Sequence, residues 1–89
     1  MEKKEILQII RSFIIEIIKL NDVNITEEST LIGSVGEFAV GLSSIEFVKL
    51  IIQLESFFKI AIDFDVKLNT VGDIINYIIE SKENDELKI

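Results

Sequence analysis

Apolar residues recur at helical spacing in three separate segments of this 89-residue chain. This pattern restricts the possible folds more than any other feature, because each such helix must bury its apolar side against another element. In the first segment the polar positions form one stripe on an otherwise apolar helix, namely Glu5, Gln8, Ser12, Glu16 and Lys19. A membrane-surface helix would instead carry Lys and Arg on its polar face. The sequence therefore predicts a small all-α bundle.

The first segment is too polar to cross a membrane, because a span needs roughly 20 mostly apolar residues. Arg11, Glu16 and Lys19 interrupt it, and no segment of the chain has the features of a signal peptide. We therefore expect a cytoplasmic protein without stable membrane insertion.

The composition excludes several kinds of site. The chain has no cysteine and no histidine, so disulfides, thiolate metal sites and any catalytic triad built on histidine are ruled out. Without such cross-links the fold depends on its apolar core alone, and 48% of the residues are apolar. A chain of this length has room for one small domain, which we expect to span residues 1–89.

The net charge of −7 argues against nucleic acid as a partner, since a phosphate backbone would be repelled. Basic protein surfaces remain plausible partners, although an acidic surface can also serve solubility alone.

Residues 21–42 show no sustained period and contain Gly33, Gly36 and Gly41, which is typical of a long connection. The glycines match no phosphate-binding fingerprint. Such a connection is long for a compact domain, so it either contains a short helical turn or has a function of its own. We expect four apolar side chains to pin it to the core, namely Ile25, Leu31, Val35 and Phe38.

Two adjacent serines, Ser43 and Ser44, stand where this connection meets the second helical segment. Ser43 and Glu46 have the spacing of a capping box, whereas a box shifted by one residue would place Phe47 where an acid is needed. Ser43 is therefore predicted to be the N-cap and Ser44 the first helical residue. The Ser44 hydroxyl is then not needed for capping and stands beside amides without intrahelical partners, at the positive end of the helix dipole. A serine pair at this place is nevertheless most often only a cap.

The second helical segment has three strips of side chains. Its core strip contains Phe47, Leu50, Ile51, Leu54 and Phe58, and its polar strip contains Glu46, Lys49, Gln53 and Ser56. A third, apolar strip of Ile45, Val48 and Ile52 begins next to Ser44. This strip either packs on another helix of the bundle or forms an exposed docking patch.

After Phe58, the stretch "KIAIDFDVKLN" indicates an extended connection with a short turn, because a lone strand would have no partner. Thr70 and Asp73 form a second capping box that opens the last helix. The predicted buried face of that helix consists of Val71, Ile74, Ile75, Ile78 and Ile79. From about residue 82 the polar tail is expected to fray.

The chain resembles the phosphopantetheine-dependent acyl and peptidyl carrier proteins. That family has a short motif, often Asp-Ser-Leu preceded by glycine, at the start of its second helix. "GLSSIEFVKLIIQLESFF" is similar to this helix, with Ser44 at the modified serine and Ile45 at the next apolar position, and "LNTVGDIINYI" is similar to the last helix. The resemblance covers the chain from the first helix to about Ile79. It implies a four-helix bundle with three main helices.

Three departures from the family pattern stand out. Ser43 replaces the usual acid before the modified serine, and the loop "IGSVGEFAV" is longer than in simple acyl carriers. The connection "DFDVKLN" is short, so we expect the small third helix to be short or reduced to a turn. The second helix also carries Lys49 and few acids. This difference from the acidic second helix of fatty-acid carriers favours a free-standing carrier of aminoacyl or specialised acyl groups, in specialised or non-ribosomal-peptide-type metabolism.

The resemblance implies a division of labour in which the chain is not an enzyme. A phosphopantetheinyl transferase would attach 4′-phosphopantetheine from coenzyme A to Ser44, and an acyl or aminoacyl group would be held on its thiol as a thioester. Loading and condensing enzymes would dock on Ile45, Val48 and Ile52, with Glu46 and Glu55 nearby. Such contacts should be small and transient, and we expect a monomer.

Two alternatives remain open from the sequence. One is a small helical adaptor or regulatory module without a prosthetic group. The other is an enzyme, for which the available carboxylates have only the spacing of solvated loops; they are Asp22, Glu27, Glu28, Asp63 and Asp65. Asp63 and Asp65 lack the rest of a calcium-loop signature, so we expect no metal site.

Overall fold

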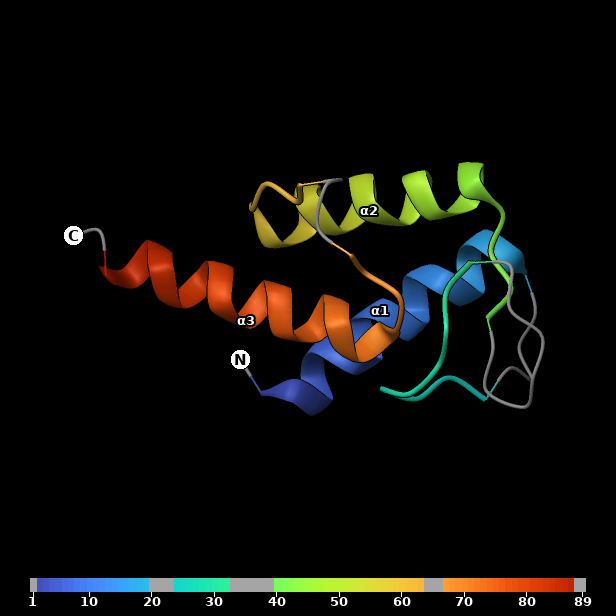
Figure 1. Ribbon diagram of the computed structural model, residues 1–89, viewed down its shortest axis with the longest axis horizontal. Coiled ribbons are helices and arrows are strands. Elements are labelled where there is room, and N and C mark those ends of the chain that lie inside the picture. Colours follow the sequence, from blue (N-terminus) through green and yellow to red (C-terminus); the bar gives the residue numbers. More distant parts are fainter. Residues whose placement is uncertain (1, 20–23, 33–39, 64–66, 88–89) are drawn as a thin grey trace.

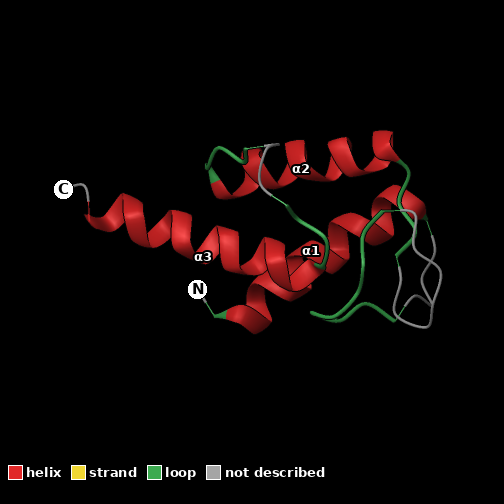
Figure 2. Cartoon of the chain, viewed as in Figure 1, coloured by secondary structure: helices red, strands yellow, loops and turns green. Residues whose placement is uncertain are grey.

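The computed structural model describes residues 2–19, 24–32, 40–63 and 67–87. This part of the chain contains three α-helices, α1 (Lys3–Ile18), α2 (Ser44–Phe58) and α3 (Val71–Leu87) (Figure 1). The same residues form no strand, only two isolated backbone bridges, so the predicted all-α class is confirmed (Figure 2). None of the described helices is both long and apolar enough to span a membrane.

The helices begin where the capping chemistry places them. The Thr70 amide donates to Asp73 Oδ2 at 3.0 Å and the Asp73 amide donates to Thr70 Oγ1 at 3.2 Å, which is the reciprocal pair expected of a capping box. Glu2 and Glu5 provide a similar contact at the start of α1, where the Glu2 amide donates to Glu5 Oε1 at 3.4 Å. These local contacts satisfy backbone donors that the helices themselves leave without partners.

α1 and α2 both end on a lysine in the left-handed conformation, with φ of 58° at Lys19 and 57° at Lys59. Glycine is the usual residue at such a position, because it has no Cβ to clash with the following carbonyl. The Lys19 amide donates to the carbonyl of Ile15 at 2.7 Å, and the Lys59 amide donates to the carbonyl of Glu55. The sequence offered no glycine or proline to mark either end.

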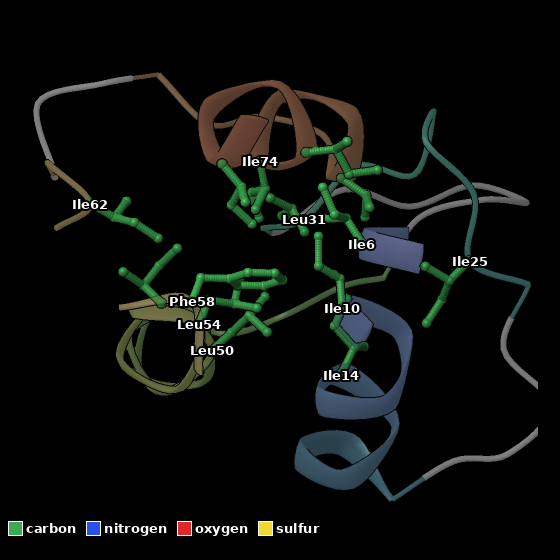
Figure 3. Packing of buried hydrophobic residues seen from close by; sticks show 14 of the residues in the cluster. Ile6, Ile10, Ile14, Ile25, Leu31, Leu50, Leu54, Phe58, Ile62 and Ile74 are labelled. Carbon is green, nitrogen blue, oxygen red and sulfur yellow. The ribbon is translucent and has the colours of Figure 1, made fainter. Parts of the chain in front are cut away.

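α1 packs against both α2 and α3, and the core lies between the three helices (Figure 3). Each helix contributes the face that its periodicity predicted: Ile6, Ile10 and Ile14; Leu50, Ile51, Leu54 and Phe58; Val71, Ile74, Ile75 and Ile78. Phe47 and Ile79, which were also expected to be buried, are half-buried at its edge. The exposed polar stripe of α1 is as predicted.

The connection between α1 and α2 is held to the start of α3 by backbone hydrogen bonds. The first amides of α3 donate back to it, Val71 to the carbonyl of Ser29 at 2.9 Å and Gly72 to the carbonyl of Glu27 at 2.8 Å. The Leu31 amide donates in turn to the carbonyl of Asn69 at 3.0 Å. Ile25 and Leu31 are buried as expected, whereas Val35 and Phe38 lie outside the described residues. The connection contains a turn at residues 27 and 28 and no helix among its described residues.

The segment between α2 and α3 contains no helix in its described residues, which are 59–63 and 67–70. The small third helix of the four-helix layout is thus not seen in these residues, and positions 64–66 lie outside the described residues. α3 continues to Leu87, further than expected, because "SKENDEL" contains good helix formers and no glycine or proline. Fraying of α3 from about residue 82 remains a prediction about the stability of the helix end.

Candidate functional site

The two serines occupy the positions that the capping pattern assigned to them. Ser43 is the N-cap of α2, with extended backbone angles, and its Oγ accepts a hydrogen bond of 3.1 Å from the Glu46 amide. The Glu46 carboxylate returns the contact, since its Oε1 accepts from the Ser43 amide at 2.9 Å. The Ser43 hydroxyl and the Glu46 carboxylate are therefore both engaged in the N-terminal cap of α2.

Ser44 is the first residue of α2 and its side chain is exposed. Within the described part of the chain its hydroxyl makes no hydrogen bond, in contrast to that of Ser43. The amides of Ser44 and Ile45 precede the first intrahelical bond and have no carbonyl of their own helix to bind. Such free amides and the positive end of the helix dipole favour a negatively charged group near the start of a helix. The residues present thus fit a phosphodiester at Ser44.

Gly41, two residues before the N-cap of α2, has a backbone conformation that favours glycine. Gly41 has φ of +73°, a value that residues with a Cβ rarely adopt, and it is exposed. The next residue, Leu42, is buried, and its amide donates to the carbonyl of Leu31 at 2.7 Å. This turn and anchor hold the start of α2 at one end of the bundle (Figure 1).

The third strip of α2 faces outward. Ile45 is 70% exposed, Val48 40% and Ile52 56%. No other described element covers these side chains, so packing on another helix does not explain them. Lys49 is also exposed and lies beside the strip. A contiguous apolar strip that begins at an exposed serine can bind a partner at that serine.

Glu46 and Glu55, the acids expected beside this strip, are both half-buried and engaged in internal hydrogen bonds. Glu46 is part of the cap, and Glu55 Oε2 accepts from the Ile62 amide at 2.9 Å. The sequence did not indicate the second contact, because Glu55 and Ile62 belong to different segments.

Three of the five carboxylates considered for an enzyme or a metal site, Glu27, Glu28 and Asp63, belong to the part of the chain that the structure describes. No group of three or more acidic residues within reach of one metal ion exists among the described residues. Glu27 and Glu28 are exposed on the turn of the connection, and Asp63 is exposed after α2. Asp22 and Asp65 lie outside the described residues.

Comparison with known proteins identifies the family to which this site belongs. A family profile described as a phosphopantetheine attachment site matches residues 8–78, which include all of α2 and the start of α3. An acyl carrier protein of Thermotoga maritima is 35% identical over 78 residues, which are 85% of this chain and 90% of that protein. An acyl carrier protein of Phytoplasma mali is 36% identical over 81 residues, covering 89% of this chain and 90% of that protein.

Proteins of this family are not themselves catalysts; they interact with a phosphopantetheinyl transferase and with enzymes that handle acyl groups. The match to the attachment-site profile and the identity along most of both relatives agree with the helical architecture. The chain therefore belongs to the acyl carrier protein family, whose members carry acyl groups on a covalently bound 4′-phosphopantetheine.

Proposed function

We propose that Ser44 is the attachment residue of the 4′-phosphopantetheine group. The observation that carries this proposal is the difference between the two serines: the Ser43 Oγ accepts the Glu46 amide, whereas the exposed Ser44 hydroxyl stands outside the cap. A transferase can reach the Ser44 oxygen without breaking the hydrogen bonds that start α2. Modification of Ser43 would instead remove the acceptor of the cap and weaken the helix.

The residues around Ser44 hold the attached group at the surface. The amides of Ser44 and Ile45 can donate to the phosphodiester oxygens, and the helix dipole favours the negative charge there. When bound, the group supplies a thiol on which the cargo is held as a thioester. The chain itself orients the attachment point and leaves the chemistry to its partners.

The exposed strip of Ile45, Val48 and Ile52 is the docking surface in this proposal, bordered by Glu46 and Glu55. Three apolar side chains give a contact that is small enough for a carrier to leave its partners as readily as it binds them.

The proposal extends to the pathway in which the carrier works. We propose specialised or non-ribosomal-peptide-type metabolism in the cytoplasm, supported by Lys49 on the exposed face of α2 and the few acids around it.

Intact-mass spectrometry after incubation with coenzyme A and a phosphopantetheinyl transferase tests the attachment site. The wild-type chain should gain the mass of one phosphopantetheine group, and Ser44→Ala should gain none. Ser43→Ala should still gain it, although more slowly because the cap is lost. Ser56→Ala is the matched control, since Ser56 is an exposed serine of the same helix and should not affect the reaction.

Two results would overturn the proposal. Modification of folded Ser44→Ala would move the site to another residue. No mass gain in the wild-type chain with several active transferases would favour an adaptor module without a prosthetic group. Circular dichroism of each variant shows that loss of modification does not come from loss of the fold.

A further inference from the structure

The negative charge of the chain is not distributed evenly over its elements. α2 and its C-terminal cap carry two acids and two lysines, Glu46, Glu55, Lys49 and Lys59, and are formally neutral within a chain of net charge −7. The excess of acids lies in the connection before α2 and in the chain after residue 60. The proposed docking helix therefore has a different electrostatic character from the whole protein.

Internal hydrogen bonds increase this difference. The Glu46 carboxylate is held by the Ser43 amide at the start of α2, and the Glu55 carboxylate is held by the Ile62 amide near its end. Both side chains are half-buried. Lys49 is exposed, and its ammonium group makes no ion pair or hydrogen bond within the part of the chain that the structure describes. The charge most available to a partner on this face is thus positive.

Lys49 lies beside the apolar docking strip, next to Ile45 and Ile52. Ile45, Lys49 and Ile52 are separated by four and three residues, so they share one face of α2. The two isoleucines are 70% and 56% exposed. Lys49 is five residues after Ser44, or about 8 Å along the helix axis. An enzyme that docks on this face of α2 to reach Ser44 is therefore placed close to this cation.

We infer that the phosphopantetheinyl transferase of this carrier binds α2 through an apolar pocket that receives Ile45 and Ile52 and has a carboxylate at its rim facing Lys49. This inference rests on the proposed function, because it takes Ser44 as the site of modification. The inference gives the transferase an acidic group opposite Lys49, which the net charge of the carrier would not predict. A carrier of charge −7 would on average favour a basic partner.

A basic transferase surface and a carboxylate opposite Lys49 predict opposite changes in KM when the charge at position 49 is reversed. A basic transferase surface would bind Lys49→Glu more tightly than wild type. A carboxylate opposite Lys49 would be repelled by the new glutamate, so the KM for the carrier would rise. Lys82→Glu is the matched control, because Lys82 is also exposed but lies on α3, and its reversal changes the net charge by the same amount.

The experiment measures kcat and KM for transfer from coenzyme A by the transferase encoded in the same genome, at ~0.02 M and ~0.5 M salt. We expect Lys49→Glu to raise KM roughly three- to tenfold at low salt, with kcat little changed and a smaller effect at high salt. Lys49→Gln should raise KM by a smaller factor, and Lys82→Glu should stay within about twofold of wild type. Ile52→Ala should raise KM at both salt concentrations, because its contact is apolar.

A lower KM for Lys49→Glu, or a change equal to that of Lys82→Glu, would overturn the inference, as would an unchanged KM for Ile52→Ala. Failure of the proposed function is a separate result, in which wild type gains no phosphopantetheine or Ser44→Ala still gains it. All substituted side chains are exposed, and circular dichroism checks that each variant keeps its helices.

Discussion

The side-chain carboxylate of Glu55 accepts a hydrogen bond of 2.9 Å from the backbone amide of Ile62. Ile62 is buried, with 4% of its surface exposed, and it belongs to the segment that leaves α2 toward α3. Tyr77 holds the same segment from α3, because its hydroxyl donates to the carbonyl of Ala61 and accepts from the amide of Asp63, both at 3.2 Å. This segment has no helix of its own among its described residues, so these contacts keep Ile62 in the core.

Replacing Glu55 therefore tests how this segment is held. Glu55→Ala leaves the Ile62 amide without its acceptor and should lower the free energy of unfolding by about 1.5 kcal/mol. Glu55→Gln keeps a neutral acceptor and should lose less than half of that amount. Urea denaturation measures both values, and hydrogen exchange at the Ile62 amide should accelerate in Glu55→Ala. Equal stability of the alanine and wild-type chains would show that the bond contributes nothing in solution.

Gly72→Ala sets helix propensity against a close contact. Propensity favours alanine over glycine in a helix by about 1 kcal/mol. A Cβ at this position, however, would stand 2.9 Å from the carbonyl oxygen of Glu27, which is backbone and accepts the Gly72 amide. We expect the contact to dominate, with a net loss of about 1–2 kcal/mol in the free energy of unfolding. Asn76→Ala, at an exposed position of α3, is the control and should be neutral or slightly stabilising. A more stable Gly72→Ala would contradict the close approach.

Lys59→Gly should stabilise the protein, although glycine substitutions usually do the opposite. Lys59 has φ of 57°, a left-handed conformation that costs a residue with a Cβ about 1 kcal/mol. Removing the Cβ should raise the free energy of unfolding by up to about 1 kcal/mol, measured by urea denaturation. Lys82→Gly is the control, because Lys82 is an exposed lysine within the right-handed backbone of α3 and its replacement should destabilise the protein. A change of the same sign in the free energy of unfolding at both positions would refute the explanation from backbone conformation.

The two serines should differ in stability as well as in modification. Ser43→Ala removes the acceptor of the Glu46 amide and should lower the free energy of unfolding by about 1 kcal/mol. Ser44→Ala removes an exposed hydroxyl outside the cap and should change it by less than about 0.5 kcal/mol. Thermal and urea denaturation of the two unmodified variants, compared side by side, give the difference. A larger loss in Ser44→Ala would mean that Ser44 supports the helix.

Much of the site could be predicted from the sequence because its structure is local. The Ser43 and Glu46 cap, the position of Ser44 as the first helical residue and the grouping of Ile45 and Ile52 on one strip all depend on side chains within a few residues of one another, whereas the exposure of that strip was left open and follows from how the helices pack. A cap is made across three residues and a helical face repeats every three or four, so the chemistry of neighbouring residues determines both. The attachment role itself came from resemblance, since a cap and an attachment site look alike in a single sequence.

The sequence by itself determined the three helices, their apolar faces and the N-terminal caps of α2 and α3, because these follow from contacts within one turn of helix. Only the tertiary structure decided which far-separated groups meet. It pairs the Gly72 amide with the Glu27 carbonyl, which favours glycine there, and it gives the Glu55 carboxylate an internal partner in Ile62. Neither contact has a periodicity or a short-range motif, because each depends on how the connecting segments fold back over the helices.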